Sequence, residues 1–365
     1  MRHSPYVTLN KQNLLHNCKL IKGLLPKATG LMAVVKADAY GHGLDVIANI
    51  LNDSADVDAF AVARIDEAVV LRKFVGNKKI LVLQGVLCVA DLQQAFEHNI
   101  DVTIHDLMQL KLFSNLQVTN KINIWLKLDT GMHRLGLQPE VLNEVWQLLQ
   151  DNKYLNNNIV LMSHFACADA ASSSHVAMQI SKFKENLEIN TDFNVSFSIA
   201  NSAAVFNYPN HLYSWVRVGL AIYGASPLLN KTTKELRLKP VMTFKAALIA
   251  IRPHKRGDTV GYGATWSAAV DTNIGVVSAG YFDGVPRSLE QGATVAIKGS
   301  FFPIVGRISM DMFTIDLGVN HACAVGDEVE IWGESVSVNE MAKKANTIGY
   351  ELYCRISKRL PRIIS

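Results

Sequence analysis

The chain has 365 residues, of which 49% are hydrophobic and 19% charged, so it has the composition of a globular protein and enough length for two domains. Its formal net charge of +4 is modest, and no basic run is interleaved with aromatic residues, which argues against a nucleic-acid partner. No stretch reaches membrane-spanning length and residues 1–10 lack the apolar core of a signal peptide, so we expect a cytoplasmic protein that binds no membrane.

The cysteines also indicate a cytoplasmic protein. They are odd in number, widely spaced and never in a C-x-x-C pair, and they are Cys18, Cys88, Cys167, Cys323 and Cys354. This pattern predicts reduced thiols. His164 and Cys167 offer two candidate ligands, which is too few for a metal site, so we expect no metal.

The chain opens with a short alternating strand and an amphipathic helix. Residues 6–9 alternate as a strand does and could return to pair with a second domain. Residues 11–25 place apolar side chains at helical spacing.

Lys36 marks the end of the next strand. Residues 31–35 form an apolar run typical of a strand buried on both faces. Gly41 and Gly43 then allow a tight turn or a close approach to a ligand, and a helical pattern begins at Leu44. An α/β barrel presents reactive groups in this order, although a lysine at a strand end, considered alone, is more often a strand terminator exposed to water.

The alternation of strand and helix continues for about 220 residues. The predicted strands are residues 31–36, 59–63, 80–83, 102–104, 122–128, 159–164, 195–200 and 215–218. Helical patterns between them cover residues 66–74, 90–96, 107–113, 141–149 and 177–187. Eight such strands predict a (β/α)8 TIM-type barrel, whereas a doubly wound sheet would need a glycine fingerprint after its first strand.

The pattern changes after a polar segment at residues 231–239. Short alternating runs follow, at residues 241–251, 274–278, 294–297, 303–305, 313–317 and 328–332. Ser337 and Glu340 then form a capping-box pattern before a helix. We therefore predict a barrel over residues 10–230 and a mainly β C-terminal domain over residues 240–365, joined by the strand at residues 5–9.

Chemistry in such a barrel gathers at the carboxyl ends of the strands. Those ends carry Lys36, Lys127, Asp129, Arg134, His164, Asn201, Ser202, Arg217 and Gly219. Cations outnumber carboxylates there, which predicts an anionic ligand such as a phosphate, cradled by Ser202 and the N–H groups near Gly219. A partly desolvated lysine among cations has a lowered pKa, the condition for a Schiff base with either a substrate carbonyl or pyridoxal phosphate.

Seven motifs in order resemble those of the alanine racemases, fold-type III pyridoxal-phosphate enzymes. They are AVVKADAYGHG at 33–43, KLDTGMHRLG at 127–136, VRVG at 216–219 with YG at 223–224, GYGATW at 261–266, GYFDG at 280–284, GRISMD at 306–311 and CRIS at 354–357. Phe282 stands where a smaller residue is usual, which leaves the chemistry intact and the shape of the entrance open.

The resemblance implies pyridoxal 5'-phosphate bound as a Schiff base to Lys36. It implies that the remaining cofactor contacts come from Tyr40, Arg134, His164, Ser202, Arg217, Gly219, Leu220 and Tyr350. Arg217 would face the pyridine nitrogen and Arg134 the phenolic oxygen. The family works as a homodimer in which the β-domain of one chain covers the barrel of the other. Tyr262 and Met310 would then act across the interface, with Met310 and Arg134 at the substrate carboxylate and Tyr281 and Asp311 in support.

The implied reaction interconverts L- and D-alanine with one base on each face of the α-carbon, Lys36 and the partner copy's Tyr262. A phenol with a pKa of about 10 is a poor base at neutral pH, so cations must lower it, and His164 and Arg217 are the candidates. Arg217 would leave the pyridine nitrogen unprotonated and so disfavour transamination. Lys127 is either carbamylated, as is frequent in the family, or a solvated lysine.

Other functions remain possible from the sequence. The nearest alternatives are a broader-specificity amino-acid racemase and a fold-type III decarboxylase, the latter expected to bring a cysteine in place of Tyr262. A cofactor-free aldolase would not need Arg217, and a non-catalytic pyridoxal-phosphate carrier would lack the β-domain. If the chain is a racemase, the family resemblance implies that it supplies D-alanine for cell-wall peptidoglycan.

Overall fold

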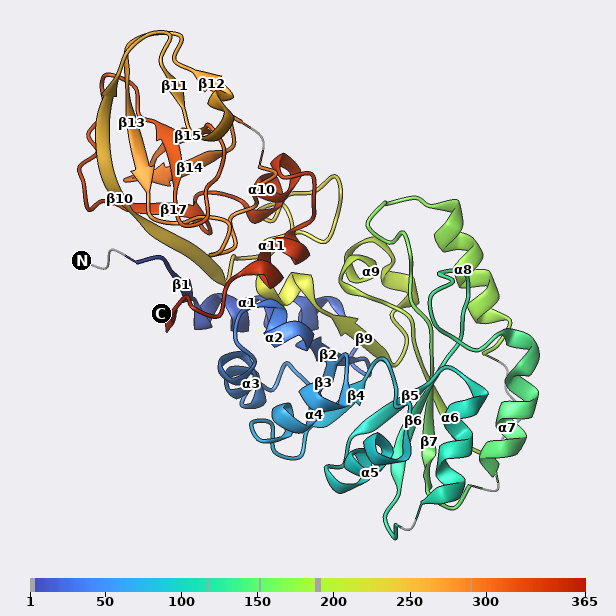
Figure 1. Cartoon of the computed structure of the whole chain (residues 1–365). Helices are drawn as coiled ribbons and strands as arrows, with labels where there is room; N and C mark the ends of the chain where they lie inside the picture. Colours follow the sequence, from blue (N-terminus) through green and yellow to red (C-terminus); the bar gives the residue numbers. More distant parts are fainter. Residues whose placement is uncertain (1–3, 117, 151, 188–191, 290) are drawn as a thin grey trace.

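The computed structural model describes residues 4–116, 118–150, 152–187, 192–289 and 291–365. Figure 1 shows two bodies in sequence order, a barrel with surrounding helices and a mainly β body reached after about residue 240. The fold class predicted from the sequence is confirmed. Across the described residues, the helices are all too short or too polar to span a bilayer.

The barrel is an eight-stranded parallel sheet in which neighbouring strands follow chain order. Its strands are β2 (Gly30–Val34), β3 (Ala59–Val62), β4 (Lys79–Val82), β5 (Asp101–Ile104), β6 (Ile122–Lys127), β7 (Leu155–Met162), β8 (Asn194–Ser198) and β9 (Trp215–Val218). The ring closes because β9 pairs with β2, and because Arg217 and Ser214 donate backbone N–H bonds of 3.0 Å to the carbonyls of Ala200 and Phe197.

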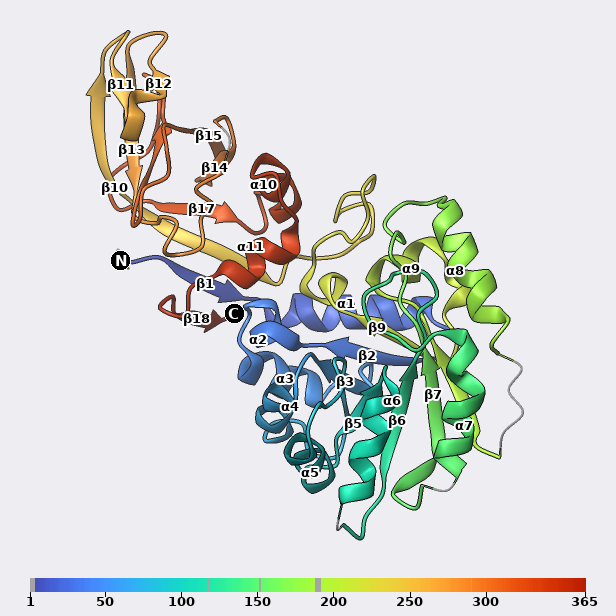
Figure 2. The ribbon, with the colours of Figure 1, turned by 45° about the vertical axis from the view of Figure 1, so that its right-hand side comes forward.

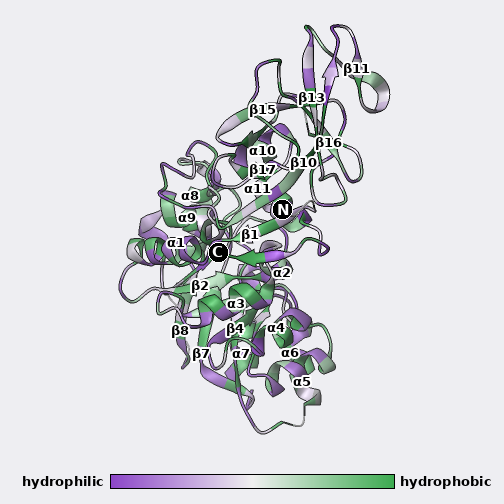
Figure 3. Ribbon diagram, turned by 90° about the vertical axis from the view of Figure 1, so that its left-hand side faces the viewer, coloured by the Kyte–Doolittle hydropathy of each residue, from purple (hydrophilic) through white to green (hydrophobic). Residues whose placement is uncertain are grey.

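Amphipathic helices cover the outside of the barrel. They are α1 (Lys11–Leu24), α2 (Lys36–Tyr40), α3 (Leu44–Asn52), α4 (Ile65–Arg72), α5 (Val89–Glu97), α6 (Leu107–Lys111), α7 (Leu142–Gln150), α8 (Ser174–Lys184) and α9 (Ser202–Asn207), with 3-10 turns η1 (Leu112–Asn115), η2 (Pro139–Val141), η3 (Pro209–His211) and η4 (Leu220–Tyr223). Figure 3 shows hydrophobic and hydrophilic stretches alternating along these helices. Their apolar faces and the strands, such as the fully buried β3, form the core.

The C-terminal domain is built on a second eight-stranded sheet, in the order β13-β16-β15-β14-β17-β10-β1-β18, in which β13 also pairs with β10. Its elements are β10 (Met242–His254), β11 (Thr259–Val260), η5 (Tyr262–Ala264), β12 (Trp266–Ser267), β13 (Thr272–Val277), β14 (Thr294–Ile297), β15 (Ser300–Val305), β16 (Phe313–Asp316), β17 (Glu328–Trp332), α10 (Val338–Lys344), α11 (Gly349–Arg355) and β18 (Arg362–Ile364).

Both ends of the chain belong to this second sheet. The strand β1 (Tyr6–Leu9) pairs antiparallel with β10, as predicted for residues 6–9, and parallel with the C-terminal strand β18. In Figure 2, β18 and the C-terminus lie beside β1 and close to α2. The sheet therefore brings the last residues of the chain to the start of the barrel.

The predicted capping box at Ser337 is wrong, although the helix does begin there. Ser337 occupies the N-cap position of α10 but its side chain makes no capping hydrogen bond. Ser337 and Glu340 both line the cavity between the domains instead. The short hairpin β11–β12 and the helix α11 were not predicted, because two-residue strands and a seven-residue helix carry too few residues to show a period.

Candidate active site

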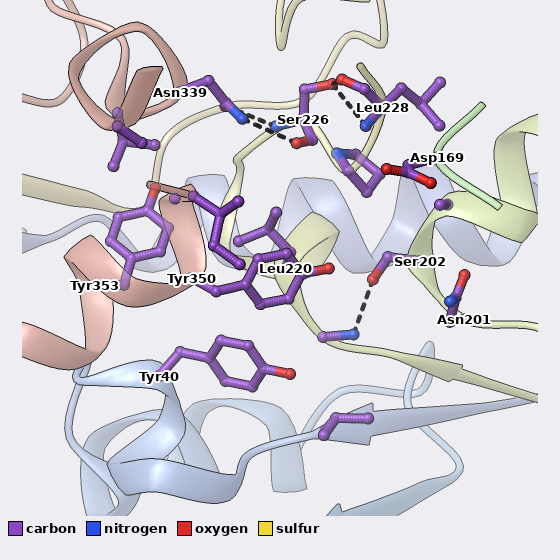
Figure 4. Close-up of a pocket in the computed structure, with 18 of the residues that line it drawn as sticks. Tyr40, Asp169, Asn201, Ser202, Leu220, Ser226, Leu228, Asn339, Tyr350 and Tyr353 are labelled. Carbon is purple, nitrogen blue, oxygen red and sulfur yellow. Dashed lines mark hydrogen bonds between the residues drawn. The ribbon is translucent and has the colours of Figure 1, made fainter. Parts of the chain in front are cut away.

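A cavity of about 1730 Å³ opens at the carboxyl ends of the barrel strands and continues beneath the second domain. It is lined by residues predicted from the strand ends, namely Lys36, Lys127, Arg134, His164, Asn201, Ser202, Arg217 and Gly219, and by Tyr40, Leu220 and Tyr350, which the family resemblance implies. Asp129, also predicted at the rim, does not line it, because its carboxylate accepts the N–H groups of Gly131 and His133 in the following turn. Figure 4 shows part of the cavity, with Tyr40, Tyr350 and Ser202 facing the same space. The structure thus brings together groups that are more than 300 residues apart in sequence.

Lys36 follows strand β2 and leads directly into a left-handed turn. The backbone φ angles of Ala37, Asp38, Ala39 and Tyr40 lie between 52° and 54°, and Gly41 continues at 73°. Left-handed backbone costs about 1–2 kcal/mol per non-glycine residue, so the surrounding structure must hold this turn in place. It carries both Lys36 and Tyr40 to the cavity.

Several cations line the cavity, and burial together with neighbouring positive charge lowers the pKa values of two of them, Lys36 and Lys127. Burial, followed by the charge of Arg134, lowers the pKa of Lys36. Burial, followed by Arg217 and Arg134, lowers the pKa of Lys127 to about 8. Both amines are therefore easier to deprotonate than an exposed lysine, which is what a Schiff base or a carbamate requires of an amine.

Arg217 is a buried cation held by neutral groups. Its guanidinium donates to the hydroxyl of Ser198, to the backbone carbonyl of Ser163 and, at 3.2 Å, to Nδ1 of His164. Burial lowers the pKa of Arg217 to about 10, which still leaves it protonated at neutral pH. The side chain is thus a fixed hydrogen-bond donor at the floor of the cavity.

His164 is neutral, which corrects one expectation. Burial, followed by the charge of Arg217, lowers the pKa of His164 well below its ordinary value. The predicted role of His164 as a cation that acidifies a phenol is therefore wrong, because its proton is lost among buried positive charges. Arg217 remains the candidate for that role.

One wall of the cavity has the donors that an anion requires. Ser202 Oγ accepts the N–H of Gly219 at 3.0 Å, so its own hydroxyl proton can point toward a ligand. Asn201 rather than Ser202 caps helix α9, by accepting the N–H of Ala204 at 3.1 Å. A Cβ at Gly219 would lie 2.4 Å from Tyr40 Oη, so only glycine leaves room for that hydroxyl.

These residues fit a phosphate-bearing cofactor. Tyr40 and Tyr350 place their rings 5.8 Å apart on the same wall, beside Leu220 at the start of η4. Burial raises the pKa of both phenols, to about 12 for Tyr350, so each hydroxyl keeps its proton and can donate it. The neutral hydroxyl donors suit an anionic phosphate, and Lys36 and Arg217 beside them suit a ring that carries an aldehyde.

The remaining predicted residues lie on the β-domain outside this cavity. Tyr262 on η5 is 71% exposed, and Met310 and Tyr281 are also exposed. Asp311 is tied by an ion pair of 2.7 Å to Arg359. In Figure 1 the β11–β12 hairpin that carries Tyr262 is remote from α2, so Tyr262 does not reach the cavity of its own chain.

Several residues at the site were not predicted. Glu67 accepts the N–H of Ala37 at 2.7 Å, and Arg362 donates to the carbonyl of Gly41. Asp169 and Cys354 also line the cavity, and Cys354 belongs to the CRIS motif at 354–357 although no role at the site was predicted for it. None of these positions follows a strand end, so their place at the site depends on the tertiary fold.

The chain matches two family models. Residues 9–227 match the description "Alanine racemase, N-terminal domain", and residues 241–364 match "Alanine racemase, C-terminal domain". The alanine racemase of Shewanella amazonensis is 38% identical over 363 residues, 99% of each chain, and that of Nitrosococcus oceani is 40% identical over 358 residues, 98% of each.

Solved structures agree over the whole length. The biosynthetic alanine racemase of Pseudomonas aeruginosa has a TM-score of 0.95 and 38% identity, with all of both chains covered. The alanine racemase of Bacillus anthracis with bound L-Ala-P has a TM-score of 0.86 and 29% identity, and 100% of this chain and 96% of that chain are covered.

Proposed function

The chain belongs to the alanine racemase family of isomerases, and from that premise we propose that it interconverts L- and D-alanine with pyridoxal 5'-phosphate as cofactor. The observation that carries the proposal is the meeting of Lys36, Arg217, Tyr40 and Ser202 in one cavity of a chain that matches the family throughout. When bound, pyridoxal phosphate supplies an aldehyde for the amino group and a ring that accepts electrons from the α-carbon.

Neutral donors would hold the cofactor phosphate. Tyr40, Tyr350 and Ser202 would donate hydroxyl protons to it, and the backbone N–H of Leu220 would complete the cradle, while the N–H of Gly219 donates to Ser202 Oγ at 3.0 Å and so orients that hydroxyl. Lys36 would hold the aldehyde end and Arg134 the phenolic oxygen. This division of contacts would fix the ring at both ends, so the substrate α-carbon would be presented in one orientation.

Lys36 moves a proton at one face of the α-carbon. Its lowered pKa leaves a larger share of the amine neutral near pH 7 than an exposed lysine has, so Nζ can accept a proton. A fixed α-carbon cannot turn over in the site, so the opposite face needs a second acid–base group. Tyr262 of a partner copy serves that face, with Arg217 as the cation that favours its phenolate.

Arg217 directs the outcome of the reaction. The protonated guanidinium of Arg217 would donate a hydrogen bond to the ring nitrogen without transferring its proton, whereas a carboxylate would keep that nitrogen protonated. The ring would then accept electrons from the α-carbon more weakly, which would disfavour transamination. Neutral His164 supports this role of Arg217, because its Nδ1 accepts a hydrogen bond from the guanidinium and so fixes the plane of that group.

The substrate carboxylate is bound by Arg134 and by the backbone N–H of the partner copy's Met310, with Tyr281 and Asp311 supporting that segment. Lys127, with a pKa of about 8, has enough neutral amine to take up carbon dioxide as a carbamate, which would convert repulsion with Arg134 into attraction. On this proposal the protein works in the cytoplasm, and its product D-alanine is used to build cell-wall peptidoglycan, as the family resemblance implies.

Mixing two inactive variants tests the shared site. Lys36→Ala and Tyr262→Phe are each expected to lack activity, but an equal mixture allowed to exchange subunits contains mixed dimers with one intact site. Such a mixture should recover about a quarter of the wild-type rate of L- to D-alanine conversion in a coupled assay, because half of the dimers are mixed and each has one working site of two. Failure to recover activity from two inactive variants would place both residues in the site of one chain, and an active Tyr262→Phe protein would show that Tyr262 is not a base.

A panel of amino acids separates the alternatives. Racemisation of serine or larger substrates at comparable kcat/KM would favour the broader-specificity racemase. Release of carbon dioxide from an amino acid would favour the decarboxylase. If the wild-type protein has no activity on L- or D-alanine, the proposal is overturned.

A further inference from the structure

The turn that presents Lys36 is held from the far end of the chain. We infer that Arg362, on the C-terminal strand β18, is a positioning residue that fixes the left-handed turn at residues 37–41 and thereby the placement of Lys36 and Tyr40. The inference rests on the proposed role of Lys36, but its structural content can be measured without activity.

The turn needs an external support because its own backbone disfavours it. Left-handed conformation in four successive non-glycine residues, Ala37 to Tyr40, is contrary to the preference of L-amino acids. Inside the turn, the N–H groups of Ala39, Gly41 and Gly43 donate to the carbonyls of Val35, Ala37 and Asp38, each at 3.0 Å, and the N–H of His42 donates to the carbonyl of Ala39 at 3.1 Å. These local hydrogen bonds exist only while the turn is formed, and each contributes about 0.5–1.5 kcal/mol, which is comparable to the cost of one left-handed residue, so contacts from outside help to decide the conformation.

Arg362 supplies such contacts at the C-terminal end of the turn. Its Nε and Nη2 donate to the carbonyl of Gly41 at 3.1 and 2.9 Å, and Nη2 lies 3.6 Å from a carboxylate oxygen of Asp38. The arginine side chain is only 14% exposed, so water competes weakly for these bonds. A cation that binds a carbonyl through two nitrogens fixes both the position and the orientation of that peptide group.

The opposite end of the turn is tied to the barrel. Glu67 of α4 accepts the N–H of Ala37 at 2.7 Å, and Asp38 Oδ1 accepts the N–H of Leu44 at 2.8 Å. Arg362 is therefore the charged donor that the β-domain adds to the turn, beside the ring contact of Tyr40 with Tyr350 of α11. Without it, the carbonyl of Gly41 loses two charged donors, and the segment between Ala37 and Leu44 is free to relax toward right-handed backbone.

The strand that carries Arg362 is itself well anchored. Strand β18 pairs in parallel with β1, the N–H of Val7 donates to the carbonyl of Pro361 at 3.0 Å, and the N–H of Ser365 donates to Leu9 at 2.9 Å. Since β1 also pairs with β10, the strand that carries Arg362 is part of the β-domain sheet. Figure 2 shows β18 and β1 running close to α2. The placement of Lys36 thus depends on how the β-domain sheet sits on the barrel.

Arg72 provides a matched control. It is also a partly buried arginine that donates to backbone carbonyls, those of His98, Gly76, Lys78 and Asn99, but these loops lie at the opposite end of the barrel from the cavity. Arg72→Met should therefore report the general cost of losing such a side chain, and Arg362→Met that cost together with any effect on the turn.

Hydrogen exchange on the cofactor-free protein measures the turn directly. In a peptide covering residues 36–44, Arg362→Met should raise the exchange rate of the amides of Gly41, Gly43 and Leu44 on the order of tenfold or more, and Arg72→Met should leave them unchanged. The rate at which added pyridoxal phosphate forms its absorbing Schiff base should fall in parallel for Arg362→Met, with Arg362→Lys in between because it keeps the charge but loses the paired donors.

Each outcome of these two measurements either supports or overturns the positioning role of Arg362. Faster exchange and slower Schiff-base formation in Arg362→Met alone support the positioning role, and equal behaviour of the Arg362→Met and Arg72→Met proteins overturns it. If Arg362→Met does not fold, Arg362→Lys and Arg362→Gln are compared with Arg72→Lys and Arg72→Gln by the same two measurements. If the wild-type protein does not racemise alanine, the proposed function fails, whereas the exchange result still decides whether Arg362 holds the turn.

Discussion

Replacing Gly219 by alanine tests whether the cavity wall is the phosphate site. A Cβ at this position would lie 2.4 Å from Tyr40 Oη and 2.9 Å from Cζ, whereas ordinary contact begins near 3.4 Å. The Tyr40 hydroxyl would have to retreat by about 1 Å. It cannot do so freely, because its ring is buried between Tyr223 and Tyr350, whose centroids are 5.0 and 5.8 Å away.

The expected cost has two parts. Forcing an extra methyl group into a packed site costs about 1–3 kcal/mol, and losing a hydrogen bond to a charged group costs about 1.5–3 kcal/mol. Part of the first cost is relieved as Tyr40 moves, so the pyridoxal-phosphate Kd of Gly219→Ala should rise about 10- to 100-fold, the equivalent of roughly 1.4–2.8 kcal/mol. The measurement is a spectroscopic titration of the cofactor-free protein.

Two further variants separate the causes. Tyr40→Phe removes the hydroxyl without adding a methyl group and should weaken binding less than Gly219→Ala. Gly23→Ala in α1, where an added Cβ would meet nothing within 4 Å, should leave binding unchanged. Wild-type affinity in both Gly219→Ala and Tyr40→Phe would refute the assignment of this wall to the phosphate.

The two remaining predictions concern the buried cations. Arg217→Glu should produce more aminated cofactor per turnover, since a carboxylate keeps the pyridine nitrogen protonated, and an unchanged ratio in the absorbance spectrum would contradict the role given to Arg217. For Lys127, the folded-state pKa of about 8 lies below the ordinary value of 10.5, so the unfolded chain binds more protons between these values. The unfolding free energy of the wild-type protein relative to Lys127→Met should therefore rise as pH increases from about 8 to 10 in carbonate-free buffer, and a flat difference would show that Lys127 titrates normally.

The barrel and most of its rim could be predicted because both follow from local pattern. A parallel strand buried on both faces is a short apolar run, and the residue after it lies at the same end of the barrel as its counterparts. Lys36, Lys127 and Arg217 were found by this rule, and they line one cavity. This rule can be applied without knowing any contact between segments that are distant in sequence.

Other features could not be predicted, because they depend on segments distant in sequence. The left-handed turn after Lys36 contains two alanines, which favour right-handed helix when considered alone. Its conformation depends on Glu67 and on Arg362, which is 321 positions beyond Gly41. The neutrality of His164 has the same origin, since it reflects charges that the fold gathers from several strands.

The clustered cations indicate how the site balances stability and function. In the protein alone, burial and neighbouring cations lower the pKa values of Lys36 and Lys127, which is unfavourable for folding at neutral pH. An anionic cofactor and a substrate carboxylate would reverse that balance by providing the missing negative charge. The same repulsion that costs stability keeps the lysine amines reactive, so removing a cation to stabilise the fold should make Lys36 more basic and less able to form a Schiff base.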